Sequence, residues 1–282
     1  MAAVSIAASA ALSIANVWAG LAGGSTSVTA AGAEFAGDVL ASTIVLLGML
    51  AAAKPPDENH PYGHGRLETL AGLAVGVLLA AGGAAICYQS LQRVGERHPP
   101  PQAFALWTLA VAAGVKSALS YGKFRVGRRI RSAALIADAW NDAVDILAAT
   151  AAAAAVGLTV YDASRFLSAD HYGGFAVGLV VVYSGLRVAR DASLQLMDTM
   201  PDAALMEQIR AVAMAVPNVR GVEKCFARKT GLQYHVDLHL EVDPDITVRE
   251  SHEIATQVRA AIKQTMDSIA DVLVHVEPAG ML

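Results

Sequence analysis

Six blocks of mostly apolar residues, each long enough to cross a bilayer, constrain the fold of this chain more than any other feature. A transmembrane helix needs about 20 such residues, and the blocks run over about 3–23, 30–53, 68–92, 103–122, 132–158 and 171–191. Only 16% of the residues are charged and the mean hydropathy is +0.44, which excludes an ordinary soluble protein. The sequence therefore predicts a membrane protein built on a bundle of six transmembrane helices.

The last eighty or so residues have the composition of a soluble domain. We therefore expect a transmembrane domain over residues 1–200 and a soluble domain over 201–282. The first apolar block begins almost at Met1 but lacks a basic segment before it, so we expect no cleaved signal peptide. A net charge of −4, with no long basic block, argues against a nucleic-acid partner. Two cysteines, Cys87 and Cys225, in very different segments exclude a disulfide-stapled secreted domain.

Basic residues gather in alternate short loops between the apolar blocks. They are Lys54, Arg66, Lys123, Arg125, Arg128, Arg129, Arg131, Arg187 and Arg190. Arg93 and Arg97 in the third loop are the one exception. Because cytoplasmic loops carry the excess of lysine and arginine, we expect both termini and the tail in the cytoplasm. The expected location is the plasma (inner) membrane.

Acidic side chains interrupt the second and fifth apolar blocks. Glu34 and Asp38 are four residues apart and share a helix face, and Asn141 and Asp145 have the same spacing. Asp138 and Asp142 form a competing pair, so spacing alone leaves the register on the fifth block open. Such acids are costly in a membrane and mark function by default. With only Lys116 as an intramembrane cation, these carboxylates must hold protons or bind a cation; hydration near a helix end is the alternative for Glu34 and Asp138.

The soluble tail has the pattern of a small α+β domain. Leu205, Ile209, Val212 and Val216 mark an amphipathic helix, and apolar residues alternate with polar ones over 232–242. Residues 219–227 are expected to form the partner strand, and 272–276 a final strand. Thr247 with Glu250 three residues later is a capping box that opens a helix over about 247–267. The predicted order is αββαβ, an open-faced sheet too small for an enzyme cleft of its own.

The segment from Pro56 to Glu68, PDENHPYGHGRLE, resembles the loop between the second and third spans of the cation diffusion facilitators. The span count, the paired four-residue spacings and the soluble tail extend the resemblance over essentially the whole chain. It implies six transmembrane helices, a cytoplasmic metallochaperone-like domain, and a homodimer that exports a divalent metal by proton antiport. The chain is then a secondary active transporter and not an enzyme.

Carried over by position, the resemblance implies four transport-site ligands: Glu34, Asp38, Asn141 and Asp145. It selects Asn141 and Asp145 on the fifth span, with Asp142 as a neighbour. Zinc-transporting members usually carry histidine where Asn141 stands, and Glu34 replaces the commoner aspartate or histidine. Because the remaining donors are all oxygens, which suit harder ions, the sequence favours Mn²⁺, then Fe²⁺, over Zn²⁺ and Cd²⁺. An exporter of Zn²⁺, Cd²⁺ or Co²⁺ is the alternative within the family.

The resemblance implies further sites outside the membrane. In the loop, Asp57, His60 and His64 match a second metal site, with a hydrated loop that binds no metal as an equal alternative. Arg66 and Asp198 match a charge pair that locks the dimer. In the tail, the matching metal positions are His239, His252, His275 and Glu277, although a polar strand face gives the same alternation. The metal is expected as substrate and regulator, without a permanently bound cofactor.

Two other classes of function fit less well. A membrane-embedded metallohydrolase would place His60, His64 and the acids around a bound water, but these histidines lie in a loop and the intramembrane acids lack a histidine-rich set. A membrane-tethered metal sensor would use the tail but would not need buried carboxylates on two spans. The sequence therefore favours transport, with protons, the metal and the bilayer as partners.

Overall fold

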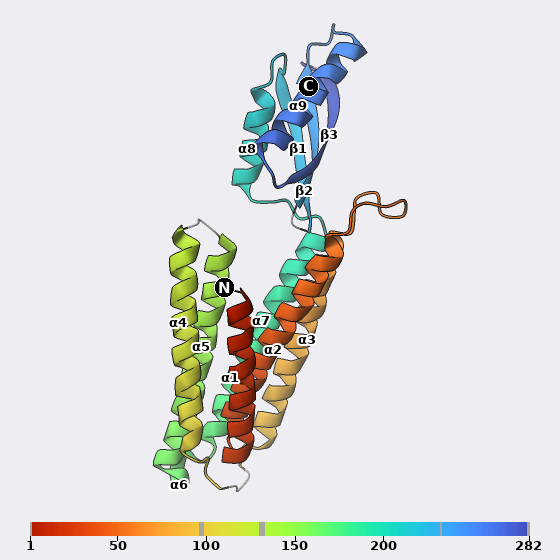
Figure 1. Cartoon of the computed structure of the whole chain (residues 1–282). Helices are drawn as coiled ribbons and strands as arrows, with labels where there is room; N and C mark the ends of the chain where they lie inside the picture. Colours follow the sequence, from red (N-terminus) through yellow and green to blue (C-terminus); the bar gives the residue numbers. More distant parts are fainter. Residues whose placement is uncertain (1, 96–98, 130–132, 232, 281–282) are drawn as a thin grey trace. The chain divides into compact units, whose positions relative to one another are not determined.

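The computed structural model describes residues 2–95, 99–129, 133–231 and 233–280 (Figure 1). Within these ranges the side chains of residues 2, 3, 45, 49 and 133–138 are not described. Arg97 and Arg131 of the predicted loops, and the side chain of Asp138, therefore lie outside the described residues.

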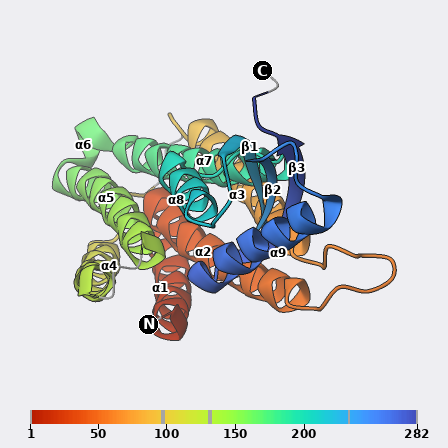
Figure 2. The ribbon, with the colours of Figure 1, turned by 90° about the horizontal axis from the view of Figure 1, so that it is seen from above.

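Six long helices in the described ranges are long and apolar enough to cross a membrane, which confirms the predicted bundle. They are α1 (Ala2–Gly23), α2 (Thr26–Ala52), α3 (Arg66–Gln92), α4 (Phe104–Arg129), α5 (Ala133–Tyr161) and α7 (Ala169–Leu196). A short helix, α6 (Ala163–Phe166), follows α5 and is capped by the carboxylate of Asp162. Helix α4 contacts α1 and packs along α5, which lies beside it in Figure 2.

Helix α4 continues further than predicted. The apolar block ends near residue 122, but the helix runs to Arg129 and takes in most of the basic cluster assigned to a loop. Lysine and arginine are good helix formers, so no residue in this stretch except Gly127 opposes continuation. Lys123 is 2% exposed, because its ammonium group turns toward α5. The basic cluster is therefore partly a helix face and not a solvated loop.

Contacts divide the chain into two compact units. One contains Met1–Leu46 and Gly72–Arg190, and the other contains Leu47–Ala71 and Asp191–Leu282. The second unit thus contains the C-terminal end of α2, the N-terminal end of α3 and the loop between them, together with the C-terminal residues of the chain. The predicted domains, 1–200 and 201–282, divide the chain at a single point in the sequence, unlike these units. The predicted boundary stays a prediction.

Glycines allow α3 and α7 to approach closely in the first unit. A Cβ atom on Gly76 would lie 2.4 Å from the backbone nitrogen of Ala189, and one on Gly185 would lie 2.4 Å from that of Ala80. Small residues of this kind let membrane helices pack backbone against backbone. Gly76 of the third apolar block therefore serves packing within the chain.

A buried aspartate ties the start of α2 to the start of α7. Asp170 is fully buried and accepts hydrogen bonds from the Ser25 hydroxyl at 2.6 Å, the Thr26 amide at 2.5 Å and the Ser27 hydroxyl. These donors include backbone groups at the N-terminus of α2, which have no partner within their own helix. Asp170, in the first turn of α7, thus caps the N-terminus of α2.

The C-terminal part of the chain has the predicted αββαβ order. Its elements are α8 (Ala203–Met214), β1 (Gly221–Thr230), β2 (Gln233–Val242), α9 (Val248–Thr265) and β3 (Ile269–Pro278). Strand β2 is central, antiparallel to β1 and parallel to β3. Helices α8 and α9 cover one face of the sheet (Figure 1).

The alternation on β2 separates a core face from a polar face. Val236, Leu238 and Leu240 are at most 1% exposed and pack in one cluster with Val258 and Ile262 of α9. The side chains between them point to the other face and are only partly covered. The strand thus supplies the core and, on its other face, carries His239, which the sequence analysis singled out.

The capping box of α9 yields a stability prediction. The Thr247 hydroxyl accepts a hydrogen bond from the Glu250 amide, and the Glu250 carboxylate accepts one from the Thr247 amide. Thr247→Ala should therefore destabilise α9 by about 1 kcal/mol. Amide hydrogen exchange along α9 in the intact protein measures the effect, with Thr256→Ala, inside the same helix, as the control. Equal loss of protection in both variants would contradict the assignment.

The same box sets a pH dependence. Hydrogen bonds from the backbone and hydroxyl of Thr247 hold the pKa of Glu250 below its ordinary value. The stabilising contribution is therefore complete above the unfolded-state pKa of about 4.3 and is lost as pH falls through the lower folded-state pKa. Protection of the first turn of α9 should fall in that acidic range.

Candidate metal centre

Two of the predicted ligands meet inside the first unit on a single buried cation. The Nζ atom of Lys116, at the middle of α4, lies 2.6 Å from Asp145 Oδ2 and 3.1 Å from Asp38 Oδ2. Asp145 comes from α5 and Asp38 from α2, so three helices contribute to this point. Lys116 is 2% exposed, and the side chain of Asp38 is 26% exposed. The structure thus forms a cation position between carboxylates within the spans.

A third aspartate continues this set of charges along α4. Asp142 of α5 places Oδ1 3.5 Å from the Lys116 ammonium and Oδ2 2.7 Å from that of Lys123. Asp142, Lys116 and Lys123 are all nearly buried. Charges buried in this way persist because each is paired. The sequence analysis named Asp142 and Lys116 but gave neither a role in the site. A lone lysine in the middle of an apolar block was the feature that could have indicated the pairing of Lys116 with these acids.

Glu34 is buried one turn before Asp38 on α2. Its Oε2 atom is enclosed and has no hydrogen-bond partner among the described residues. Asp145, Asp38 and Lys116 lie near enough for their charges to act on it. An enclosed carboxylate oxygen without a donor is costly unless a proton or a cation satisfies it.

Asn141 lies apart from this cluster in the structure. Its side chain is exposed, whereas Asp142 and Asp145 are buried. The buried stripe of α5 passes through Asp142, Asp145, Ala149 and Ala152, which follows the spacing of a helix face packed against a neighbour. The four-residue spacing of Asn141 and Asp145 does not by itself decide whether Asn141 or Asp142 faces α4.

The loop residues predicted as a metal site do come together. Asp57 Oδ1 lies 3.0 Å from His60 Nδ1, and Asp57 Oδ2 lies 3.5 Å from His64 Nε2. One ligand atom from each residue lies within 4.8 Å of the others. His60 holds the pKa of Asp57 below its ordinary value through a side-chain hydrogen bond. This carboxylate therefore stays ionised and available as a ligand.

Three of the four predicted tail residues also converge. His239 on β2 and His275 and Glu277 on β3 bring ligand atoms within 4.8 Å of one another. His239 Nδ1 lies 2.5 Å from Glu277 Oε1, and Glu223 of β1, which was not predicted, lies 3.8 Å from the same nitrogen. His252 is exposed on α9 and is not brought into this cluster. Parallel pairing that sets His239 opposite His275 assembles the cluster.

The predicted charge pair forms within one chain. Arg66 Nη2 lies 2.6 Å from Asp198 Oδ1, and both side chains are about half exposed. Its proposed effect on a dimer stays a prediction.

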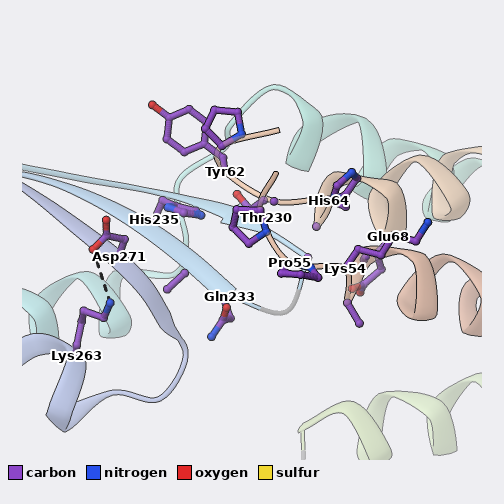
Figure 3. Close-up of a pocket in the computed structure, with 18 of the residues that line it drawn as sticks. Lys54, Pro55, Tyr62, His64, Glu68, Thr230, Gln233, His235, Lys263 and Asp271 are labelled. Atoms are coloured by element: carbon purple, nitrogen blue, oxygen red, sulfur yellow. Dashed lines mark ion pairs between the residues drawn. The ribbon is translucent and has the colours of Figure 1, made fainter. Parts of the chain in front are cut away.

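A cavity of about 760 Å³ in the second unit is lined by the loop and by the strands (Figure 3). Figure 3 shows His64, His235, Gln233 and Lys54 around it. Tyr62 of the loop packs edge-on against His235 at 5.9 Å between ring centroids. Burial, together with the charge of Arg228, lowers the pKa of His235. His235 is therefore neutral near pH 7, and sequence reasoning did not single it out.

The chain matches two family profiles in sequence order. "Cation efflux transmembrane domain" covers residues 2–197 and "Cation efflux protein, cytoplasmic domain" covers residues 201–279. The chain belongs to the cation diffusion facilitator family. This confirms the resemblance inferred from the sequence, and it makes the protein a transporter for the efflux of divalent metal cations and not an enzyme.

Several members of the family resemble this chain over most of its length. "Manganese efflux system protein MneP" of Bacillus subtilis (strain 168) is 31% identical over 267 residues, 93% of this chain and 90% of that protein. "Cation-efflux pump FieF" of Klebsiella pneumoniae is 29% identical over 262 residues, 92% of this chain and 85% of that one. "Metal tolerance protein C1" of Arabidopsis thaliana is 29% identical over 284 residues, 95% of this chain, which spans only 60% of the plant protein. The solved structure of "MamM-CTD 215-293" is 36% identical, covering 27% of this chain and 95% of that one, with a TM-score of 0.26.

The ion pairs of Asp142 in the transporter predict different effects for two neighbouring positions on α5. Asp142→Asn removes the charge that faces Lys116 and Lys123, and breaking a buried pair costs about 3 kcal/mol. Asn141→Ala removes an exposed amide and should leave stability unchanged. Thermal unfolding of the two purified variants measures the difference. A larger loss of Tm in Asn141→Ala would show that the packing of α5 is assigned wrongly.

The tail cluster of the transporter predicts a contrast between two histidines. His275→Ala should remove a Zn²⁺ binding step from the intact protein, because imidazole is a good zinc ligand and His275 lies in the cluster. His252→Ala should retain that step. Isothermal titration with Zn²⁺ distinguishes the two variants, and loss of the step in His252→Ala alone would contradict this arrangement.

Proposed function

We propose that this protein exports Mn²⁺, and Fe²⁺ next, in exchange for protons through the carboxylates of α2 and α5. The observation that carries the proposal is the convergence of Asp38 and Asp145 on one buried cation position within the spans. Ionisable residues at this depth mark ion pathways in membrane proteins. Glu34, with an enclosed oxygen that lacks a donor, supplies a third carboxylate beside them.

The charge balance of the cluster supports exchange of one metal ion for protons. Among the side chains that the structure describes, four carboxyl groups stand against two ammonium groups, namely Glu34, Asp38, Asp142 and Asp145 against Lys116 and Lys123. When every group is ionised, two negative charges remain. One divalent cation or two protons neutralise them, and leaving them uncompensated in a low-dielectric interior is expensive. Metal and protons are therefore alternative occupants of the same acids.

The donor atoms support a hard divalent ion. Glu34, Asp38 and Asp145 offer carboxylate oxygens, and either the Asn141 amide or the Asp142 carboxylate supplies a fourth oxygen from the next turn of α5. Neither choice introduces nitrogen or sulfur, so the preference for Mn²⁺ over Zn²⁺ does not depend on which one binds. The relative from Bacillus subtilis is named as a manganese efflux protein, which agrees with this preference.

The clusters outside the spans support roles as accessory metal sites. We assign Asp57, His60 and His64 to one site, and His239, His275 and Glu277 to a second that senses the exported metal.

Alternation of basic loops supports a cytoplasmic location for both termini, as expected for an exporter in the plasma (inner) membrane. The match to a dimerising cytoplasmic domain supports a homodimer.

Metal-driven proton flux in proteoliposomes tests the proposal. Mn²⁺ should drive flux, Zn²⁺ should drive less, and Asp145→Asn should abolish flux because it removes a carboxylate of the cation position. Asp162→Asn, which alters only the exposed cap of α6, is the matched control and should retain flux. Asn141→His should raise Zn²⁺ flux relative to Mn²⁺ if the amide is a ligand.

Each outcome separates one part of the proposal from the rest. Full flux in correctly inserted Asp145→Asn would overturn the transport site. Equal or greater Zn²⁺ flux in the native protein would keep the transporter and overturn the oxygen-donor argument. Metal transport without proton movement would overturn the antiport. Absence of flux with any ion would favour the metal-sensor function instead.

A further inference from the structure

The contacts of Lys116 are those of a cation bound between ligands. Its ammonium group lies within 3.1 Å of one oxygen each from Asp38 and Asp145, and within 3.5 Å of Asp142. Its Nζ atom also lies 5.2 Å from the centre of the fully buried Phe35 ring. Lys116 is the thirteenth residue of the 26-residue helix α4, too deep for its side chain to reach the membrane surface easily.

We propose that the Lys116 ammonium is a tethered cation that occupies the transport site when no metal is bound and leaves it when metal enters. This inference rests on the proposed function, because it takes Asp38 and Asp145 as metal ligands. A divalent ion binds carboxylate oxygens at about 2.0–2.2 Å. Lys116 Nζ already lies 2.6 Å and 3.1 Å from the same oxygens, so the metal and the ammonium group cannot share this position.

With the Asn141 amide as the fourth metal ligand, the Asp142 carboxylate provides the place to which the ammonium group moves. Its Oδ1 atom is 3.5 Å from Lys116 Nζ, while its Oδ2 atom lies 2.7 Å from Lys123 Nζ. A change in the terminal torsions of Lys116 brings its ammonium group onto Asp142 Oδ1 without breaking contact between α4 and α5. The lysine then keeps a buried counter-ion in both states, which a charge at this depth requires.

Two consequences for transport follow. In the empty state, Lys116 neutralises part of the site, so the carrier can return without metal at a lower electrostatic cost. In the loaded state, the nearby positive charge weakens metal binding and favours release. Lys116 thus lowers the affinity for metal and raises the rate of transport. Substitutions at this position should change the metal affinity and the maximal flux in opposite directions.

Binding and transport by three variants test the proposal at one fixed pH. Lys116→Met keeps the length of the side chain without its charge, so Mn²⁺ should bind at least about tenfold more tightly, and maximal flux should fall. Lys116→Arg keeps the charge and can bond both carboxylates at once, so Mn²⁺ should bind about tenfold more weakly. Lys123→Gln removes an equal charge about two turns along the same helix, and affinity should change less than in Lys116→Met.

The direction of these changes decides the outcome. A purely structural lysine predicts weaker or unchanged binding in both Lys116 variants, and that result would overturn the proposal. If Lys116→Met does not fold, binding by Lys116→Arg that is as tight as native, or tighter, would overturn it. A third outcome would refute the tethered cation alone. In it, the native protein transports Mn²⁺ and the Asp145→Asn variant does not, but the Lys116→Met variant binds Mn²⁺ with the native affinity. Failure of the native protein to bind or transport metal would refute the proposed function itself.

Discussion

Charge that cannot reach water is the constraint on which the first unit depends. Asp142, Asp145 and Lys116 are each less than 5% exposed, and they come from the two helices that pack along each other. An isolated ion of either sign is strongly disfavoured in such surroundings, so the position of each group is defined by the others. The contact between α4 and α5 is consequently specific: rotating either helix would leave a buried charge unpaired.

The contact between α3 and α7 follows a different principle. There the backbones approach at glycines, and the space is too small for a single added carbon. Dispersion and close fit hold such helices together, and no exchangeable ion takes part. The unit therefore contains a pair of helices, α3 and α7, that pack through small residues and a group, α2, α4 and α5, that meets through charge. A metal ion can alter only the second kind, which is consistent with the location of the proposed transport site.

The tail uses the two faces of one strand for separate purposes. The period of two along β2 sends its aliphatic side chains to α8 and α9 and leaves His239 on the opposite face. Parallel pairing with β3 then sets His275 beside His239, and Glu277 follows on the same face. A strand register, and not a local motif, therefore creates the cluster. Glu223 joins the margin of the cluster from the irregular part of β1 between Val222 and Cys225, and no nearby sequence motif marks it.

The sequence alone determined the elements and their order, because these depend on local composition. Block length predicted six spans, alternation predicted β2, and the Thr247 and Glu250 pair predicted the start of α9. Spacing also identified the acids of α2 and α5 as unusual. Spacing shows which residues share a face of one helix, but not which neighbouring helix that face contacts. It therefore could not tell whether Asn141 or Asp142 faces α4. Only the tertiary structure decided that question, since the direction of a helix face is set by the partner against which it packs. The partners of Lys116 were decided in the same way: the charges that stabilise it lie 78, 26 and 29 residues away in the chain, at Asp38, Asp142 and Asp145, and only packing brings them together.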